Sequence, residues 1–510
     1  MKQLSKKHTQ TLLASGIALL HLIVTFFTDK CIFVFGETSN KSDYIICKFI
    51  AYIVLFFFYK VLLTVIFSKE KNELLIVQIL KKAAPFALLT LAILVIKLRG
   101  GFISNDESVI FDAAKNLEHY TWFYYLTTYY YIVSLMLVPF TYGPVVIKAV
   151  IQVLVTGYTV VRAQTVFGKK AGSLSYVLFL LYPVIAYTAS AHRLPVYYLL
   201  YLVLIETLLF DYLEKKPLGN QKAFWLLLLC AILTQWRTEG IYLAALIPIL
   251  MFFVYPALRN KKNAFIYILG LLLIQYVISV PQNGLLARGL DSAANDRMKP
   301  FYAYTITNMY RNGLDLEKNS EDLAIVDRYL SIEAIAAIND YYEDINYEDV
   351  LILYQPGFVG TREEADTQDF INYSDALKRI FKNNPGVFLK TRWGAFHYAA
   401  TPFAITYQGF SPRALAAFGL SIVKSVLYNL YLPLTIILLL CLYALIRKRW
   451  FTFFLSGGVL AHWFIVFILA PASYFKYYFP VYITAYFYLL LLVITFTYNK
   501  INQSDISVIL

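Results

Sequence analysis

The sequence predicts an all-α polytopic membrane protein with about 12 transmembrane helices, an interfacial segment in one outer loop and one large extracytoplasmic loop domain. Of its 510 residues, 59% are hydrophobic and only 15% are charged, and the mean hydropathy is +0.59. Apolar stretches of roughly 17–25 residues recur, which is the length a helix needs to cross a ~30 Å hydrocarbon core. Clusters of Lys and Arg lie in alternate loops between these stretches, as in the cytoplasmic loops of membrane proteins.

Twelve stretches have the length and apolar composition of membrane-spanning helices. We expect these spans near 11–28, 45–67, 84–99, 143–166, 172–190, 195–213, 222–237, 241–257, 263–281, 419–445, 451–470 and 474–497.

The aromatic stretch Trp122–Phe140 is interpreted differently, although it is apolar. Counted as a full span, it would move Lys169, Lys170 and every later basic cluster to the outer side of the membrane. We therefore expect an interfacial or re-entrant segment that ends at Pro139. Such a segment is tolerated at membrane depth only where protein covers it or where it lines a cavity.

The charge distribution predicts the orientation and three parts of the chain. Nineteen basic residues fall in the termini and inner loops, so both termini are expected in the cytoplasm of a multi-pass cell-membrane protein. The three parts are an N-terminal transmembrane module of about nine spans (1–281, with an outer acidic loop at 100–142), an extracytoplasmic loop domain (282–414) and a C-terminal module of three spans (415–510). The loop domain holds 18 of the 32 acidic residues and 13 of the 45 basic residues. The net charge of +13 therefore comes from basic residues that orient the chain in the membrane. Membrane lipids, and not nucleic acid, are the expected partners.

An acidic pair, Asp106 and Glu107, follows the third span at the predicted outer face. Either carboxylate could act as a general base or as a metal ligand in chemistry done at that surface. The alternative is structural, because Asn105 or Asp106 before Ser108–Leu117 is also a plausible helix N-terminus.

Cations gather at the same predicted face, and several of them suit a lipid phosphate. An Arg guanidinium offers a planar fork that matches phosphate, and a Lys among tyrosines can hold a phosphate at headgroup level. Snorkelling or an internal Arg–Glu pair would explain the same residues without a ligand. The candidate binding residues are Lys148, Arg193, Arg237, Glu239, Tyr474, Lys476 and Tyr477. The sequence has no Walker A loop and no Rossmann glycine fingerprint, so a transferred group would need a donor other than a cytosolic nucleotide.

Five short motifs occur in order over about 104–250 and 383–497. They are Asp106-Glu107-x-x-x-Phe111-x-Ala113, Val166-Phe167-Gly168-Lys169, Leu181-Tyr182-Pro183, Arg237-x-Glu239-Gly240 and Ser473-Tyr474-Phe475-Lys476-Tyr477. This arrangement resembles the GT-C superfamily of membrane glycosyltransferases, the relatives of protein O-mannosyltransferases and aminoarabinose transferases. Two positions depart from the family pattern. Arg193-Leu194-Pro195 stands where the family often has R-P-D, and Lys476 stands where it has Arg.

The resemblance implies an inverting transfer of a hexose or pentose from a polyprenyl-phosphate-linked sugar donor to an envelope glycan, lipid or protein acceptor. It implies Asp106 as the general base, with Glu107 as the orienting group or as the ligand of a divalent cation (Mg²⁺ or Mn²⁺) where one is used. The cations would stabilise the leaving phosphate, and the active site would be extracytoplasmic.

Two other classes of protein fit parts of the pattern. O-antigen or polysaccharide polymerases and ligases also have about a dozen spans and a large outer loop, and they would emphasise outer-loop Arg and His. A lipid-linked glycan transporter or flippase would use Glu206, within the sixth span, as a proton-coupling residue. A buried structural role for Glu206 is the alternative.

Overall fold

The computed structural model describes residues 2–37, 39–68, 74–97, 105–119, 123–188, 190, 192–287, 293–343, 345, 347–354, 360–407 and 409–502. Within these ranges the protein is helical, and the one β-type contact is an isolated bridge between Leu330 and Thr361. The chain forms two compact units, which are described separately. The first unit comprises Met1–Gly284, Leu439–Gly458 and Ile483–Leu510, and the second comprises Leu285–Leu438 and Val459–Tyr482.

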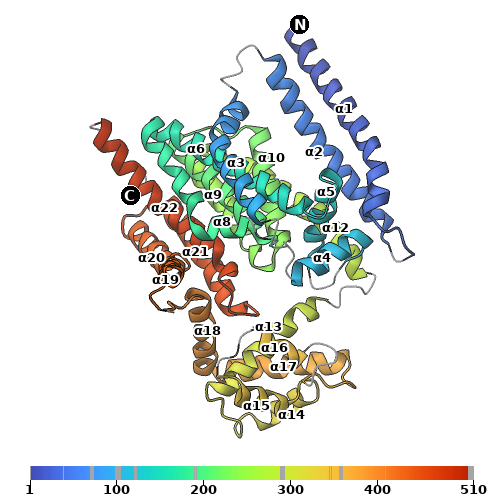
Figure 1. Cartoon of the computed structure of the whole chain (residues 1–510), viewed down its shortest axis with the longest axis vertical. Helices are drawn as coiled ribbons and strands as arrows, with labels where there is room; N and C mark the ends of the chain where they lie inside the picture. Colours follow the sequence, from blue (N-terminus) through green and yellow to red (C-terminus); the bar gives the residue numbers. More distant parts are fainter. Residues whose placement is uncertain are drawn as a thin grey trace. The chain divides into compact units, whose positions relative to one another are not determined.

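Most helices of the first unit lie in the N-terminal half of the chain (Figure 1). They are α1 (Lys2–Ile32), α2 (Lys41–Phe67), α3 (Leu75–Lys97), α4 (Asn105–Asn116), α5 (Tyr125–Leu137), α6 (Gly143–Gly172), η3 (Ser173–Ser175), α7 (Tyr176–Leu180), α8 (Tyr182–Thr188), α9 (Leu194–Glu214), α10 (Asn220–Trp236), η4 (Thr238–Gly240), α11 (Leu243–Val254), η5 (Pro256–Arg259) and α12 (Lys261–Ala287). Three later helices carry residues of both units: α20 (Tyr431–Ile446), α21 (Trp450–Leu469) and α22 (Phe479–Asn502).

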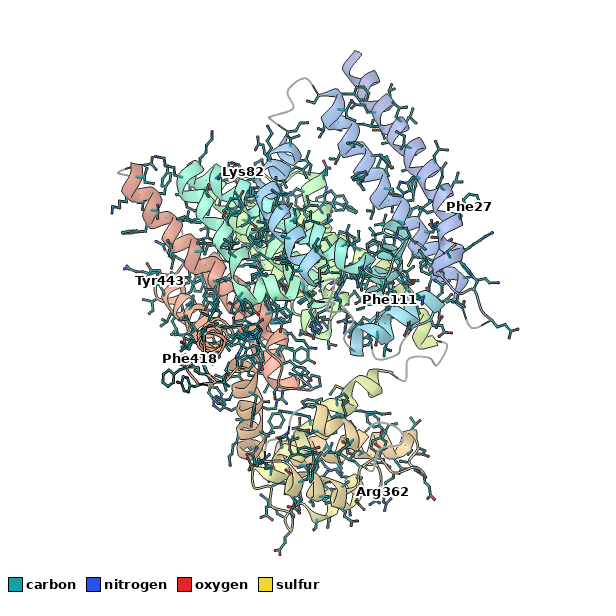
Figure 2. The ribbon with its side chains drawn as sticks, in the orientation of Figure 1. Phe27, Lys82, Phe111, Arg362, Phe418 and Tyr443 are labelled. Carbon is teal, nitrogen blue, oxygen red and sulfur yellow. The ribbon has the colours of Figure 1, made fainter. Side chains whose placement is uncertain are left out.

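The protein is a polytopic membrane protein, because nine helical segments in the described part of the chain are long and apolar enough to cross a bilayer. Exposed apolar side chains such as Phe27 project from these helices (Figure 2). The count of about 12 spans stays a prediction, since three predicted spans form shorter helices. The stretch 172–190 is broken into α7 and α8 next to Pro183, whose ring disfavours an uninterrupted helix. Helices α10 and α11 have 17 and 12 residues.

The aromatic stretch forms α5, a helix of 13 residues that ends before Pro139. At 1.5 Å per residue it is about 20 Å long, which is short of the hydrocarbon thickness. Most of its side chains are buried by neighbouring helices, including Tyr129, Tyr131 and Ile132. Its length and burial fit a protein-covered segment, and its depth in the membrane stays a prediction.

Contacts divide the loops of the first unit into two sets, one at each end of the helices. At one end the α1–α2 loop reaches α4, where Val34 N donates to Lys115 O at 2.8 Å, and Tyr125 N donates to Gln282 Oε1 at 3.2 Å. At the other end Tyr176 donates its hydroxyl to Lys82 O at 2.5 Å. The first set contains loops predicted outside and the second contains loops predicted inside. Which side of the membrane each set faces stays a prediction.

The close approach of α3 and α6 depends on one glycine. A Cβ built on Gly157 would lie 2.4 Å from the carbonyl oxygen of Ile79, which no side chain tolerates. This contact fixes α6, the helix that carries Lys148, against α3.

The second unit contains shorter helices. They are α13 (Ala293–Arg311), α14 (Ser320–Asp327), α15 (Ile332–Tyr341), α16 (Tyr347–Tyr354), α17 (Thr367–Asn383), α18 (Pro385–Ala400), α19 (Pro412–Leu427) and η6 (Phe475–Tyr478). Helix α17 begins with a capping box between Asp366 and Asp369 and buries Phe370, Leu377 and Ile380. Exposed ion pairs occur on this unit, such as Arg362 with Asp327 at 2.9 Å (Figure 2).

The orientation is tested by cysteine accessibility in a variant from which the four native cysteines have been removed. A Cys replacing Lys170 should be labelled only from the cytoplasmic side of sealed cells or vesicles. A Cys replacing Ser320 should be labelled only from the other side, because an odd number of spans is expected between them. Labelling of both positions from the same side would contradict the predicted orientation.

Candidate functional site

The acidic pair lies in the first turn of α4, which begins at Asn105. Carboxylates are favourable there because the N-terminal end of a helix dipole is positive. The side chain of Asp106, the predicted general base, lies outside the described residues. Glu107 is described and is 2% exposed.

Glu107 joins three segments of the first unit. Its Oε1 accepts a hydrogen bond from Arg193 Nη1 at 2.9 Å and a longer one from the backbone N–H of Arg193 at 3.3 Å. Its Oε2 accepts the hydroxyl proton of Tyr131 at 2.7 Å, and His192 Nδ1 lies 3.5 Å from Oε1. The structure thus brings together Glu107 and Arg193, which the sequence marked separately. Tyr131, the partner from α5, was not predicted.

Arg193 is held from a second side. Its guanidinium carbon lies 4.2 Å from the centroid of the Phe123 ring, a cation–π contact that adds to the ion pair. Arg193 is also the residue that precedes α9, so its position is tied to the start of that helix.

The surroundings of Glu107 stabilise its ionised form. Burial alone would raise the pKa of this carboxyl, but the charge of Arg193, the nearby His192 ring and the hydrogen bond from Tyr131 outweigh burial and lower the pKa to about 2. A general base works best with a pKa near the operating pH, so Glu107 is unsuited to accept a proton at neutral pH. Its contacts fit a positioning residue, and the role of Asp106 as the base stays a prediction.

The same contacts bear on the predicted metal-ligand role of Glu107. Both carboxylate oxygens already accept hydrogen bonds, and the guanidinium on Oε1 would repel a divalent cation. These contacts do not fit a ligand of Mg²⁺ or Mn²⁺, so Glu107 is poorly suited to the predicted metal-ligand role.

Lys148, predicted to bind substrate, lies under the loop before α9. It is 1% exposed, and its Nζ donates to the carbonyl oxygens of Tyr187 at 3.2 Å, His192 at 3.0 Å and Ser190. An ammonium group has three N–H donors, and all three are used here. Lys148 therefore positions the segment that carries His192 and Arg193, and binding a phosphate would break these bonds.

Arg237 and Glu239 form an ion pair within the turn between α10 and α11, which is the structural alternative expected for them. The turn lies near Arg193, because Phe123 contacts Arg193 and the next residue, Tyr124, shares a hydrogen bond of 3.0 Å with Thr238. The two Arg-bearing loops and α4 therefore lie at the same end of the first unit.

Lys476, Tyr474 and Tyr477 belong to the second unit. Lys476 Nζ lies 4.6 Å from the centroid of the Tyr474 ring and 5.9 Å from that of Tyr477. This is the predicted arrangement of a cation between tyrosines.

Asp43 makes a further buried link that the sequence did not reveal. It accepts hydrogen bonds from Tyr129 at 2.5 Å and from His119 Nε2 at 2.7 Å. Asp43 thereby joins the start of α2 to α5 and to the segment after α4. Together with the contacts of Glu107, this link holds both ends of α4 in place. The sequence shows that these segments contain polar residues, but it does not show which of them pair, because that depends on packing.

Comparisons of the chain with protein-family models, with curated proteins and with solved structures find no match.

The ionised state of Glu107 predicts a pH-dependent stability. Because folding lowers its pKa from 4.5 to about 2, the stabilisation is complete above pH 4.5 and is lost as the pH falls through that range. The free energy of unfolding in detergent should therefore fall on acidification by an amount on the order of 3 kcal/mol from this group.

Glu107→Gln should be less stable than the wild type at pH 7 and should show a smaller loss between pH 4.5 and pH 2. Asp375→Asn is the matched control, since that carboxylate is exposed and pairs with exposed Lys378. Equal stability and an equal pH slope for Glu107→Gln and wild type would contradict the assignment.

Proposed function

We propose that this protein is an integral membrane glycosyltransferase that transfers a sugar from a polyprenyl-phosphate donor to a cell-envelope glycan, lipid or protein acceptor at the outer face of the membrane. The observation that carries the proposal is the buried contact between Glu107 and Arg193. It joins the acidic first turn of α4, which the GT-C resemblance assigns to the acceptor, to Arg193, whose guanidinium suits a phosphate.

In the proposed reaction, the two residues of the acidic pair have different roles. Asp106 accepts the proton of the acceptor hydroxyl, whose oxygen attacks C1 of the sugar. The bond between C1 and the phosphate oxygen breaks, and its electron pair leaves with the polyprenyl phosphate. Glu107 stays ionised and holds Arg193, so it orients the site without taking the proton.

Cations stabilise the phosphate as it leaves. A guanidinium has five N–H donors, so Arg193 can contact phosphate oxygens while one donor serves Glu107. Arg237 lies in the neighbouring loop and would contribute similarly, with Glu239 fixing its orientation. Lys476, which lies in the second unit with Tyr474 and Tyr477, stays a phosphate contact predicted from the sequence.

One observation also fits a polysaccharide polymerase or ligase. His192 and Arg193 both face Glu107, and outer-loop Arg and His residues are what that class would emphasise. The donor separates the two functions, since a polymerase or ligase would use a lipid-linked oligosaccharide and not a single sugar on a lipid phosphate.

A carrier has less support. Glu206 is fully buried and accepts a hydrogen bond from Thr159 at 2.7 Å across the α6–α9 contact. This contact fits the structural role, in which a polar pair holds two membrane helices together.

The proposed base is tested by Asp106→Asn. The variant should lose roughly 10²–10⁴-fold in turnover, because an amide cannot accept the proton. It should keep a melting temperature close to that of the wild type, since one carboxylate in the first turn of a helix contributes only about 0.3–1 kcal/mol through the helix dipole. Turnover is followed as release of polyprenyl phosphate from a panel of polyprenyl-phosphate-linked hexoses and pentoses, presented with envelope extract as acceptor.

Asp112→Asn is the matched control, because Asp112 is an exposed carboxylate on the same helix. It should retain wild-type turnover. Wild-type turnover in Asp106→Asn would show that Asp106 is not the base.

A further inference from the structure

An apolar cavity of about 410 Å³ lies in the first unit, and its lining residues do not include Glu107 or Arg193. Its volume is within the roughly 300–1,000 Å³ that small-ligand pockets occupy. Four helices contribute to the walls, with Leu227 of α10, Met251 and Phe252 of α11, Ile268 of α12 and Phe454 of α21 among the lining residues. A wall of this composition suits a hydrocarbon chain and offers little to a sugar or an ion.

The membrane is the source of such a chain. Only 6% of the apolar stretch of α12 is buried against protein, so lipid must cover the rest of this helix. Lining residues on two helices, Phe252 and Ile268, are themselves exposed. The cavity is therefore in reach of the lipid that surrounds α11 and α12.

Three cations stand beside this cavity. Leu258 and Ala264 both line it, and the residues between them include Arg259, Lys261 and Lys262. All three cations are exposed, and none forms an ion pair with the carboxylates that the structure describes. By contrast, Lys216 and Lys222 in the preceding inner loop pair with Glu214 and Asp211 at 2.9 and 2.8 Å.

The turn that carries these cations is held in shape by side chains. Asn260 Oδ1 accepts the backbone N–H of Lys262 at 2.9 Å, and Asn263 Nδ2 donates to Ala257 O at 2.9 Å. The cations and the cavity are therefore parts of one ordered segment.

We propose that this segment binds an anionic glycerophospholipid, with an acyl chain in the cavity and the phosphate at Arg259, Lys261 and Lys262. The unneutralised positive charge selects an anionic headgroup, and each basic residue near a membrane surface attracts anionic lipid. The predicted orientation puts this turn at the inner face, opposite the acidic loop, so a lipid of the inner leaflet is the occupant and not the glycosyl donor. The proposal does not depend on the proposed transferase activity.

The experiment measures lipid binding by native mass spectrometry of the full-length protein. The detergent-purified protein is titrated with dioleoyl phosphatidylglycerol or with dioleoyl phosphatidylcholine. Wild type should bind phosphatidylglycerol more tightly. Replacing both Lys261 and Lys262 by Gln should weaken that binding about 30-fold, from about 1 kcal/mol for each cation.

Two further variants separate the parts of the site. Ala264→Phe fills the cavity beside the cations and should weaken phosphatidylglycerol binding while both lysines remain. Replacing Lys169 and Lys170 by Gln removes the same charge from another exposed basic pair and should leave the affinity at the wild-type value.

Three results would overturn the proposal. One is equal affinity for phosphatidylglycerol in all variants, and another is equal affinity of the wild type for the two lipids. The third is displacement of bound phosphatidylglycerol by an equimolar amount of polyprenyl phosphate, which would assign the cavity to the donor lipid.

Discussion

The arrangement of the candidate site depends on one buried ion pair, Glu107 with Arg193. Removing one partner of such a pair leaves the other charge buried without compensation, which costs about 3–5 kcal/mol. The pair is satisfied on both sides, since Tyr131 donates to the second carboxylate oxygen and Phe123 stacks under the guanidinium. The first turn of α4, the start of α5 and the start of α9 are consequently fixed with respect to one another.

Other buried polar groups support the same end of the first unit. Lys148 holds the loop before α9 through three carbonyl groups, and Asp43 holds the segment after α4 through His119 and Tyr129. Burying a charged or polar group costs free energy unless it has such partners. The contacts of each network therefore hold its side chains in place. These contacts fit positioning roles for Glu107 and Lys148. Asp106 remains the proposed base, and Arg193 and Arg237 remain the proposed phosphate contacts.

The sequence was sufficient for the elements that depend on local pattern. Apolar runs predicted the long membrane helices, such as α2 and α9. Hydropathy could not predict that the stretch 172–190 is broken, because its apolar residues continue past Pro183. The three-part division and the orientation depend on the placement of the chain in a membrane and stay predictions.

The candidate site was only partly predictable, because its contacts join distant parts of the chain. Glu107 and Arg193 were each marked as candidates, but they are 86 residues apart and their pairing comes from packing. Tyr131 is one of 43 tyrosines, and nothing in its local pattern sets it apart. Lys148 resembled an outer-face cation at the end of an apolar run, whereas burial beneath a loop gives it a different role.

A double-mutant cycle on Glu107 and Arg193 tests the central claim most directly. The free energy of unfolding in detergent is measured for wild type, Glu107→Gln, Arg193→Gln and the double variant at pH 7. If the two residues form an ion pair, their coupling energy should be about 1–3 kcal/mol. The double variant should then lose that much less free energy of unfolding than the sum of the losses in the two single variants. Single effects that add to within about 0.5 kcal/mol would contradict the claim that this pair joins α4 to the loop before α9.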